Sequence, residues 1–200
     1  MRKISILFIR HGKTAGNLAG RYVGRTDEPL CPAGREALRA VAPPNADAVF
    51  VSPLRRCRES AELLFPALAP VAVPGLEECD FGEFEMKNYA ELNGRADYQA
   101  WIDSGGELPF PGGESRAGFQ ARCCRAFAEL AATLLRPDGP ERPALVVHGG
   151  TIMAILSRYG QPRRDYFDWQ AKNGAGYRAE LAWVDGEPRL SEITAFPANP

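Results

Sequence analysis

Long apolar runs and a large net charge are both missing from this chain of 200 residues, and each absence excludes a class of protein. No stretch approaches the roughly 18 apolar residues that a membrane-spanning helix needs. The apolar run at residues 4–9 stops at Arg10, which makes it too short for the core of a signal peptide. The formal net charge is −1, so no global positive field attracts nucleic acid or an anionic membrane. We therefore expect no nucleic acid or membrane partner.

Metal-binding and disulfide patterns are also absent. The five cysteines are an odd number without CxxC spacing, which fits neither a disulfide framework nor a zinc knuckle, and they are Cys31, Cys57, Cys79, Cys123 and Cys124. Such cysteines favour a reducing compartment, so we expect a cytoplasmic protein. There are only two histidines, and no HxH or HExxH motif supplies further metal ligands. We expect neither a metal nor a cofactor.

What the sequence does contain is typical of one globular α/β domain spanning residues 1–200. Hydrophobic residues make up 45% and charged residues 24% of the chain. Continuous apolar runs predict strands that are buried on both faces, at residues 4–9, 48–51 and 144–147. Helical patterns follow at residues 14–20, 32–41, 54–64, 115–135 and 151–159. Repeated strand–turn–helix units predict a three-layer sandwich, with a mostly parallel sheet and helices on both faces.

Two further segments carry local signals. Residues 177–184 and 189–195 flank Asp185 and Gly186, which together predict a β-hairpin. Residues 75–114 hold many glycines, prolines and acidic residues without a clear periodicity. A long irregular stretch in a compact domain is usually a lid or a binding segment, so we expect an insertion that shapes the substrate site.

The two histidines occupy equivalent places in the predicted sheet. His11 follows one apolar strand and His148 another, and a glycine comes after each of them. Ligands of open α/β sheets bind beyond the carboxyl ends of the strands, where both histidines would lie. Arg10 and Arg56 also follow strands, and guanidinium groups match phosphate oxygens. At about 4 Å and an effective dielectric of about 20, each charge pair contributes roughly 4 kcal/mol. The pattern indicates a phosphate site.

Several motifs together resemble one family, the histidine phosphatase superfamily, which includes phosphoglycerate mutases. The motifs are FIRHGKTAGN, GRYVGRTDEPL, SPLRRCRESA, LEECDFGEFE, PGGES and VVHGGTI, in the family's order. The resemblance implies a phosphoglycerate mutase-like fold and a phosphatase in which His11 becomes phosphorylated. It also implies a proton donor, Glu78, and a set of residues that hold the phosphoryl oxygens, namely Arg10, Asn17, Arg56 and His148.

The proton donor lies in a cluster of five carboxylates, Glu77, Glu78, Asp80, Glu83 and Glu85. The family's spacing to the glycine of a Phe-Gly pair, here Gly82, selects Glu78. The residues alone leave its neighbours open as donors. Two positions depart from the family pattern: Lys13 would add a charge near the mouth of the pocket, and Cys31 replaces a capping threonine, so we expect a poor N-cap there.

Within the superfamily, the GEFEM and PGGES segments and the short chain are similar to α-ribazole-5′-phosphate phosphatases. This resemblance implies hydrolysis of α-ribazole-5′-phosphate in cobalamin synthesis. The alternatives are a broad-specificity phosphomonoesterase and a phosphoglycerate mutase, which returns the phosphoryl group to its substrate. A non-catalytic phosphate-binding domain and a metallohydrolase are further alternatives. The sequence does not indicate the oligomeric state.

Overall fold

A six-stranded sheet forms the centre of the computed structural model, which describes residues 2–42 and 44–197. The strands are β1 (Lys3–Arg10), β2 (Ala48–Val51), β3 (Pro70–Ala72), β4 (Pro143–Val147), β5 (Gly176–Val184) and β6 (Glu187–Phe196). Their order is β3-β2-β4-β1-β5-β6, with β3, β2, β4 and β1 parallel and β5 and β6 antiparallel. The α/β class and the mostly parallel sheet are confirmed.

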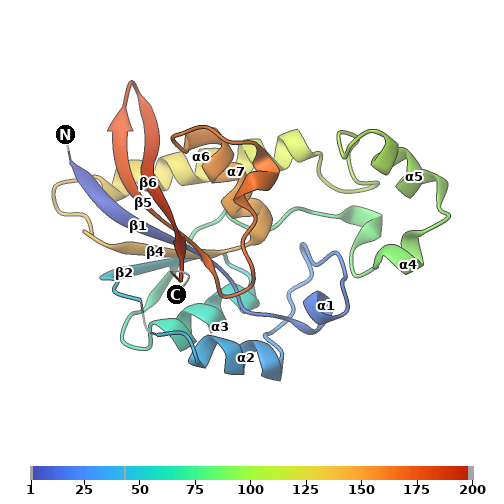
Figure 1. Ribbon diagram of the computed structural model, residues 1–200, viewed down its shortest axis with the longest axis horizontal. Helices are drawn as coiled ribbons and strands as arrows, with labels where there is room; N and C mark the ends of the chain where they lie inside the picture. Colours follow the sequence, from blue (N-terminus) through green and yellow to red (C-terminus); the bar gives the residue numbers. More distant parts are fainter. Residues whose placement is uncertain (1, 43, 198–200) are drawn as a thin grey trace.

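Helices cover both faces of the sheet (Figure 1). They are α1 (Ala15–Leu18), α2 (Pro32–Arg39), α3 (Arg55–Leu64), α4 (Tyr89–Leu92), α5 (Ala96–Asp103), α6 (Arg116–Leu134) and α7 (Gly149–Tyr159), with the 3-10 turns η1 (Gly82–Phe84) and η2 (Tyr166–Trp169). The helices α6 and α7 lie on one face, and α2 and α3 lie on the other. None of the described helices is both long and apolar enough to cross a membrane.

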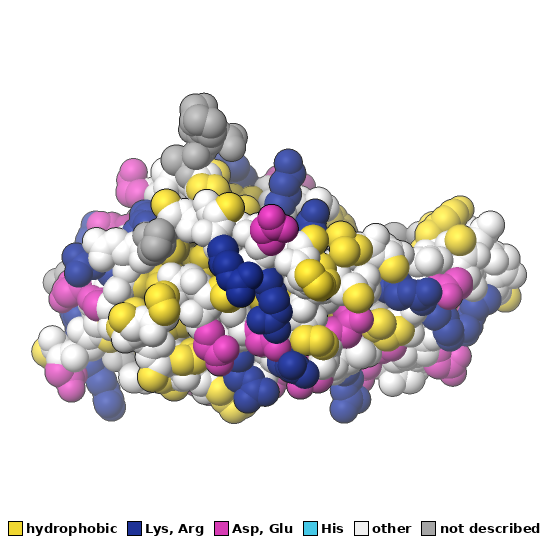
Figure 2. Space-filling view, turned by 90° about the horizontal axis from the view of Figure 1, so that it is seen from below, with side chains coloured by type: hydrophobic (Ala, Val, Ile, Leu, Met, Phe, Trp, Pro, Cys, Tyr) yellow, Lys and Arg dark blue, Asp and Glu magenta, His cyan; other side chains and the backbone are white. Residues whose placement is uncertain are grey.

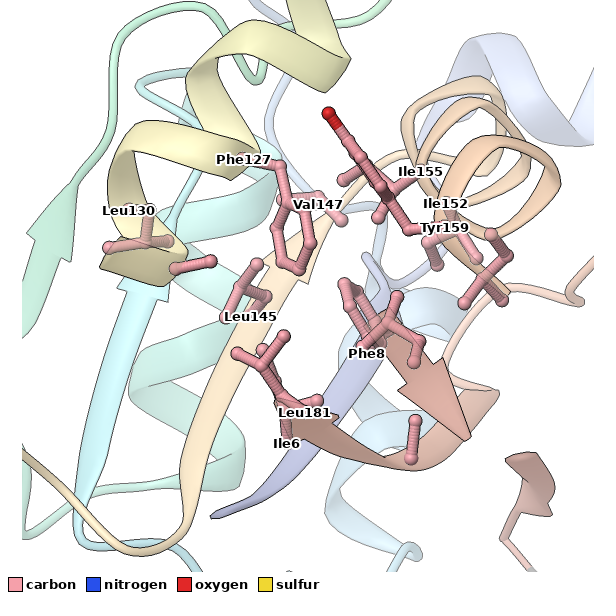
Figure 3. Close-up of a cluster of buried hydrophobic side chains, with 14 of the residues drawn as sticks. Ile6, Phe8, Phe127, Leu130, Leu145, Val147, Ile152, Ile155, Tyr159 and Leu181 are labelled. Atoms are coloured by element: carbon pink, nitrogen blue, oxygen red, sulfur yellow. The ribbon is translucent and has the colours of Figure 1, made fainter. Parts of the chain in front are cut away.

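The strand β1 shows why both faces need a cover. Its side chains alternate, so that Ile6 and Phe8 belong to one buried cluster while Leu7 and Ile9 belong to another. In the first cluster, Phe8 and Leu181 from the sheet pack with Phe127 of α6 and with residues of α7 (Figure 3). Because each face buries its own set of apolar side chains, the sheet is stabilised from both sides.

Two local sequence signals, one for a hairpin turn and one for a helix cap, differ in how well they agree with the structure. The hairpin prediction is confirmed, since Asp185 and Gly186 form a two-residue turn with φ of 52° and 84°. Positive φ at both positions is typical of a type I′ turn. The expectation of a poor cap at Cys31 is wrong, because its Sγ accepts a hydrogen bond from the Gly34 amide at 3.3 Å.

The insertion at residues 75–114 contains more regular structure than its composition indicated. It includes η1, α4 and α5, which lie away from the sheet at one end of the molecule (Figure 1). Because these elements are short, the 3.6-residue periodicity of apolar side chains repeats too few times in them to be detected. The three-residue strand β3 was missed for a similar reason, since it lies at the sheet edge with Val71 and Ala72 exposed.

The sheet topology brings the two histidines to one edge. The strand β1 pairs with β4 in parallel, with Arg10 opposite Val147, so His11 and His148 follow the same end of two adjacent strands. The strand β2 pairs with β4 on its other side, with Val51 opposite Val146. The segment after β2 therefore reaches this edge as well.

Candidate active site

His11 is held as a neutral imidazole with one nitrogen free. Its side chain is 3% exposed, and Nδ1 lies 2.7 Å from the carbonyl oxygen of Gly12. A carbonyl can only accept, so Nδ1 carries the hydrogen and Nε2 keeps its lone pair. Burial lowers the pKa of His11 well below its ordinary value of 6.5, and the charges of Arg56 and Arg10 lower it further. At neutral pH, Nε2 is a potential nucleophile.

His148 lies beside His11 and is fully buried. The two ring centroids are 5.1 Å apart in an edge-on arrangement, and Nε2 of His148 lies 2.8 Å from the hydroxyl oxygen of Ser52. Burial lowers the pKa of His148 well below 6.5, with smaller contributions from Arg56 and His11. Among the coloured side chains in Figure 2, no histidine reaches the surface shown, as this burial requires.

Arg56 lies at the start of α3 with its side chain fully buried. Its guanidinium group donates to the carbonyl oxygens of Thr26 and Gly24, both at 2.8 Å. Within the described part of the chain, its Nε has no hydrogen-bond partner. The nearby Arg55 and Arg58 are exposed, and Arg55 pairs with Glu59 at 2.7 Å. Of these three arginines, Arg56 is the one directed into the protein.

Arg10 ends β1, and its guanidinium group also has unused donors. Its Nη1 donates to the carbonyl oxygen of Ala171 at 2.9 Å, whereas its buried Nε lacks a partner among the described residues. Gly149 makes room for it, since a Cβ there would stand 3.3 Å from the guanidinium carbon. Buried donors without partners are rare in native proteins. An anion beside Arg10 and Arg56 would satisfy them through charge-assisted hydrogen bonds.

A buried hydroxyl group joins the two strand ends that carry these residues. Ser60 Oγ accepts a hydrogen bond from the Gly12 amide at 2.9 Å and donates to the carbonyl oxygen of Arg56 at 2.6 Å. Ser60 therefore fixes the loop after β1 against the first turns of α3. This contact sets the position of His11 relative to Arg56.

Asn17 lies in α1, at the edge of the site. Its Oδ1 accepts from the Thr14 amide at 3.2 Å and from the Asn173 amide group at 3.3 Å. Asn173 also donates to the carbonyl oxygen of His11 at 3.0 Å, which links Asn17 to the histidine loop. Because Oδ1 is occupied, Nδ2 is the atom of Asn17 that remains for a phosphoryl oxygen.

The five clustered carboxylates occupy different surroundings. Glu83 pairs with Arg95 at 3.1 Å, Glu77 lies 3.5 Å from Arg122, and Asp80 pairs with Arg25 at 3.0 Å. Glu85 accepts hydrogen bonds from the loop backbone at residues 24 and 25. Glu78 differs from the others, because it lines a cavity together with Arg10.

Backbone groups on two sides hold Glu78 in place. Its Oε2 accepts from the Gly150 amide at 3.1 Å, at the first turn of α7, and Oε1 accepts from the Cys79 amide at 3.0 Å. A Cβ at residue 150 would collide with Oε1, so a larger residue there would displace the Glu78 carboxylate. Arg122 of α6 donates to the carbonyl oxygen of Glu78 at 3.2 Å and holds Glu114 at 2.7 Å.

The cavity beside Arg10 and Glu78 has a volume of about 510 Å³. Its lining also includes Gly149 and Gly150, and aromatic side chains form much of the remainder. Lys13 does not line it and instead borders a separate hollow of about 220 Å³. The expectation that Lys13 adds a charge near the pocket mouth stays a prediction.

Sequence reasoning missed several residues around this site. Ser52 and Ser60 both lie within SPLRRCRESA, and Ser60 follows Arg56 by one helical turn, which is a signal that could have found it. No comparable signal marked Asn173 or Arg122, because their partners are distant in the sequence. The described residues contain no cluster of three or more histidine, cysteine or acidic side chains suited to a metal ion.

The model of the histidine phosphatase superfamily (branch 1) matches residues 6–194 of the chain. The chain belongs to the histidine phosphatase superfamily. It is therefore an enzyme, a phosphatase of the phosphoglycerate mutase-like fold. The matched residues include both histidines, Arg10, Arg56 and Glu78.

Relatives with different activities match most of this histidine phosphatase. It is 33% identical to the 2,3-bisphosphoglycerate-dependent phosphoglycerate mutase 2 of Gloeobacter violaceus, over 76% of this chain and 73% of that protein. It is 26% identical to the adenosylcobalamin/α-ribazole phosphatase of Escherichia coli K12, over 83% and 84%. The crystal structure of the α-ribazole phosphatase from Shigella flexneri superposes with a TM-score of 0.76 at 24% identity, covering 94% of each chain.

Proposed function

We propose that the protein hydrolyses a small phosphate monoester through a phosphohistidine intermediate on His11. The state of His11 carries this proposal: its Nδ1 is tied to the Gly12 carbonyl, its Nε2 is free, and burial keeps the ring neutral. Phosphoryl transfer depends mainly on positioning and on stabilising charge at the phosphoryl oxygens. The unused donors of Arg10 and Arg56 support such a site.

The reaction would take place in two displacements. In the first, Nε2 of His11 bonds to phosphorus as the ester P–O bond breaks, and Glu78 in its acid form donates a proton to the leaving oxygen. In the second, water attacks phosphorus as the P–N bond breaks, and the Glu78 carboxylate accepts the proton of the water. Nε2 then recovers its lone pair and inorganic phosphate leaves. Arg10, Arg56, His148 and Nδ2 of Asn17 would bind the phosphoryl oxygens.

We further propose α-ribazole-5′-phosphate as the substrate, within cobalamin synthesis. The Escherichia coli relative named for α-ribazole matches the chain over 84% of its own length, and the GEFEM and PGGES segments resemble those of such phosphatases. The five cysteines are unpaired in the structure, which supports a place in the reducing cytoplasm.

Trapping of the phosphoenzyme tests the reaction. On brief incubation with α-ribazole-5′-phosphate labelled with ³²P, we expect an acid-labile, alkali-stable labelled protein and steady release of phosphate. The His11→Ala variant should do neither, with turnover at least about 10⁴-fold slower. A labelled His11→Ala protein would show that another residue is the nucleophile.

Substrate choice needs a separate comparison. Ribose 5-phosphate also releases the primary 5′-hydroxyl group of a ribose but lacks the base, so a higher kcat/KM for α-ribazole-5′-phosphate is expected. Equal values would leave a broad-specificity phosphomonoesterase as the function.

Phosphoglycerate mutase is a second candidate, because a mutase is among the relatives that are more than 30% identical. A mutase would interconvert 3-phosphoglycerate and 2-phosphoglycerate, with a dependence on 2,3-bisphosphoglycerate. We expect no such interconversion and no stimulation. Isomerisation that exceeds phosphate release would favour the mutase.

A further inference from the structure

The cavity beside the catalytic residues is aromatic along most of its wall. Its ring-bearing lining residues are Tyr22, Phe81, Trp101, Phe110, Phe119, Tyr166 and Phe167. The insertion at residues 75–114 provides three of these rings, and η2 provides two more. The same cavity contains Arg10 and Glu78, so whatever fills it lies next to the phosphoryl site.

The rings meet one another in the geometries that aromatic groups prefer. Trp101 and Phe110 lie with centroids 5.0 Å apart and planes inclined by 32°, and Tyr22 contacts Phe81 at 5.2 Å. Tyr166 and Phe167 meet edge to face at 5.1 Å. Phe167 is nevertheless 59% exposed, so most of its surface is available to a ligand.

Few charges are free along this wall. Among the described residues that line the cavity, the cations are Arg10 and Arg116, and the acid is Glu78. Arg116 forms an ion pair with Glu107 and donates to the carbonyl oxygen of Gly105 at 3.3 Å. A carboxylate next to the phosphate ester would therefore find no unpaired cation besides Arg10, which the phosphoryl group needs.

We propose that this cavity is a leaving-group subsite for a flat, uncharged aromatic ring that is joined to the phosphate ester. Trp101 and Phe167 are its specificity-determining residues, one from the insertion and one from η2. The volume of about 510 Å³ lies within the range of small-molecule sites, about 300–1,000 Å³, and accommodates a bicyclic ring. The proposal rests on the phosphatase reaction proposed above and does not require α-ribazole itself.

The subsite discriminates in two ways. A ring gains contact and stacking against the aromatic wall, which an aliphatic group of similar size gains only in part. An ester with a carboxylate, such as 3-phosphoglycerate or phosphoserine, has to desolvate that charge against apolar side chains. Both effects favour ring-bearing esters over the phosphorylated acids.

Three esters of primary alcohols test the subsite, because their leaving groups have similar basicity. Benzyl phosphate carries the ring, cyclohexylmethyl phosphate carries a puckered group of similar size, and 3-phosphoglycerate carries a carboxylate. We expect kcat/KM to be about tenfold higher for benzyl than for cyclohexylmethyl phosphate, and at least about 100-fold higher than for 3-phosphoglycerate.

Two variants test whether the aromatic wall of the cavity causes the preference for benzyl phosphate. Trp101→Leu and Phe167→Leu should each lower the ratio of the benzyl to the cyclohexylmethyl value by about five- to tenfold. Tyr89→Leu is the matched control, since Tyr89 is exposed in α4 and does not line the cavity, and its ratio should stay at the wild-type value. Phe167 is exposed, so its variant folds even if Trp101→Leu does not.

A binding measurement separates this proposal from the reaction. Calorimetric titration of benzyl phosphate into the His11→Ala protein should show binding that Phe167→Leu weakens by about five- to tenfold. If benzyl phosphate is hydrolysed no faster than cyclohexylmethyl phosphate, or if the variants keep the wild-type ratio, the subsite is wrong while the phosphatase stands. If no ester labels His11 although the rings bind benzyl phosphate, the proposed reaction fails and the subsite remains.

Discussion

The two sides of the active site are built by different forces. On the phosphoryl side, His11, His148 and Arg56 are buried and Arg10 is half-buried, and His11 and both arginines are hydrogen-bonded to backbone carbonyls. On the leaving-group side, aromatic rings from the insertion and from η2 contact one another, and part of their surface reaches solvent. Directional hydrogen bonds fix the first side, whereas ring packing shapes the second.

This difference separates the part of the site that determines the reaction from the part that determines the choice of substrate. Hydrogen bonds to buried charges allow little change of geometry, so the phosphoryl side suits one reaction. Apolar ring contacts are non-directional, so exchange of one ring alters the shape of the cavity without disturbing the charges. The predictions below probe one side while the other stays intact, beginning with the largest expected effect.

Removing the carboxyl group of Glu78, the proposed proton donor, should affect esters differently according to their leaving groups. For Glu78→Gln we expect a 10²- to 10⁴-fold loss of kcat with alkyl phosphates, because the amide cannot protonate the leaving oxygen. The loss with p-nitrophenyl phosphate should be far smaller, since its leaving group needs no proton. Steady-state rates for both esters check this, and equal losses would redirect the acid role to Glu83 or Glu85.

Breaking the link between the two strand ends should lower stability. Ser60→Ala leaves the buried Gly12 amide without its acceptor, at a cost of about 1–3 kcal/mol in the free energy of unfolding. Chemical denaturation measures the change. Thr133→Ala, at an exposed helical position of α6, is the control and should stay within about 0.5 kcal/mol. A Ser60→Ala protein as stable as the control would show that the bridge contributes nothing.

A variant that loosens the backbone around Glu78 should lower kcat in the same way as Glu78→Gln, but to a smaller extent. Arg122→Gln removes the ion pair with Glu114 and the hydrogen bond to the Glu78 carbonyl. We expect about tenfold lower kcat with alkyl phosphates, and a smaller change with p-nitrophenyl phosphate. Arg125→Gln, on the exposed face of the same helix, is the control. Equal slowing of both esters would mean that Arg122 serves the fold alone.

Acid should weaken the phosphoryl side through the two histidines. Their pKa values are lowered in the folded protein, so the unfolded chain binds more protons below about pH 6.5 and stability falls as the pH is lowered from there. Each histidine contributes a slope of up to about 1.4 kcal/mol per pH unit. Denaturation between pH 7 and 5 measures how steeply the free energy of unfolding depends on pH. His11→Gln should reduce this slope by the contribution of one histidine. An unchanged slope would contradict a buried neutral His11.

The sequence predicted most of the sheet and the residues at its edge, because long apolar runs and adjacent motif residues are local signals. The runs at residues 48–51 and 54–64 correspond closely to β2 and α3. The wall of the cavity was harder to predict, since Tyr22, Trp101 and Phe167 come from separate segments whose meeting depends on the tertiary fold. Short elements such as α4 and the capping role of Cys31 likewise depend on local geometry that composition does not show.

The hydrogen bond from the Gly150 amide to Glu78 gives the proposed proton donor a spectroscopic reporter. The amide proton senses the charge on the carboxylate that accepts it, so its chemical shift should change when Glu78 gains or loses a proton. Gly150 is the second residue of α7, and the second histidine, His148, caps the start of this helix. One resonance could follow the acid and base states of the donor during turnover, without any label on the substrate.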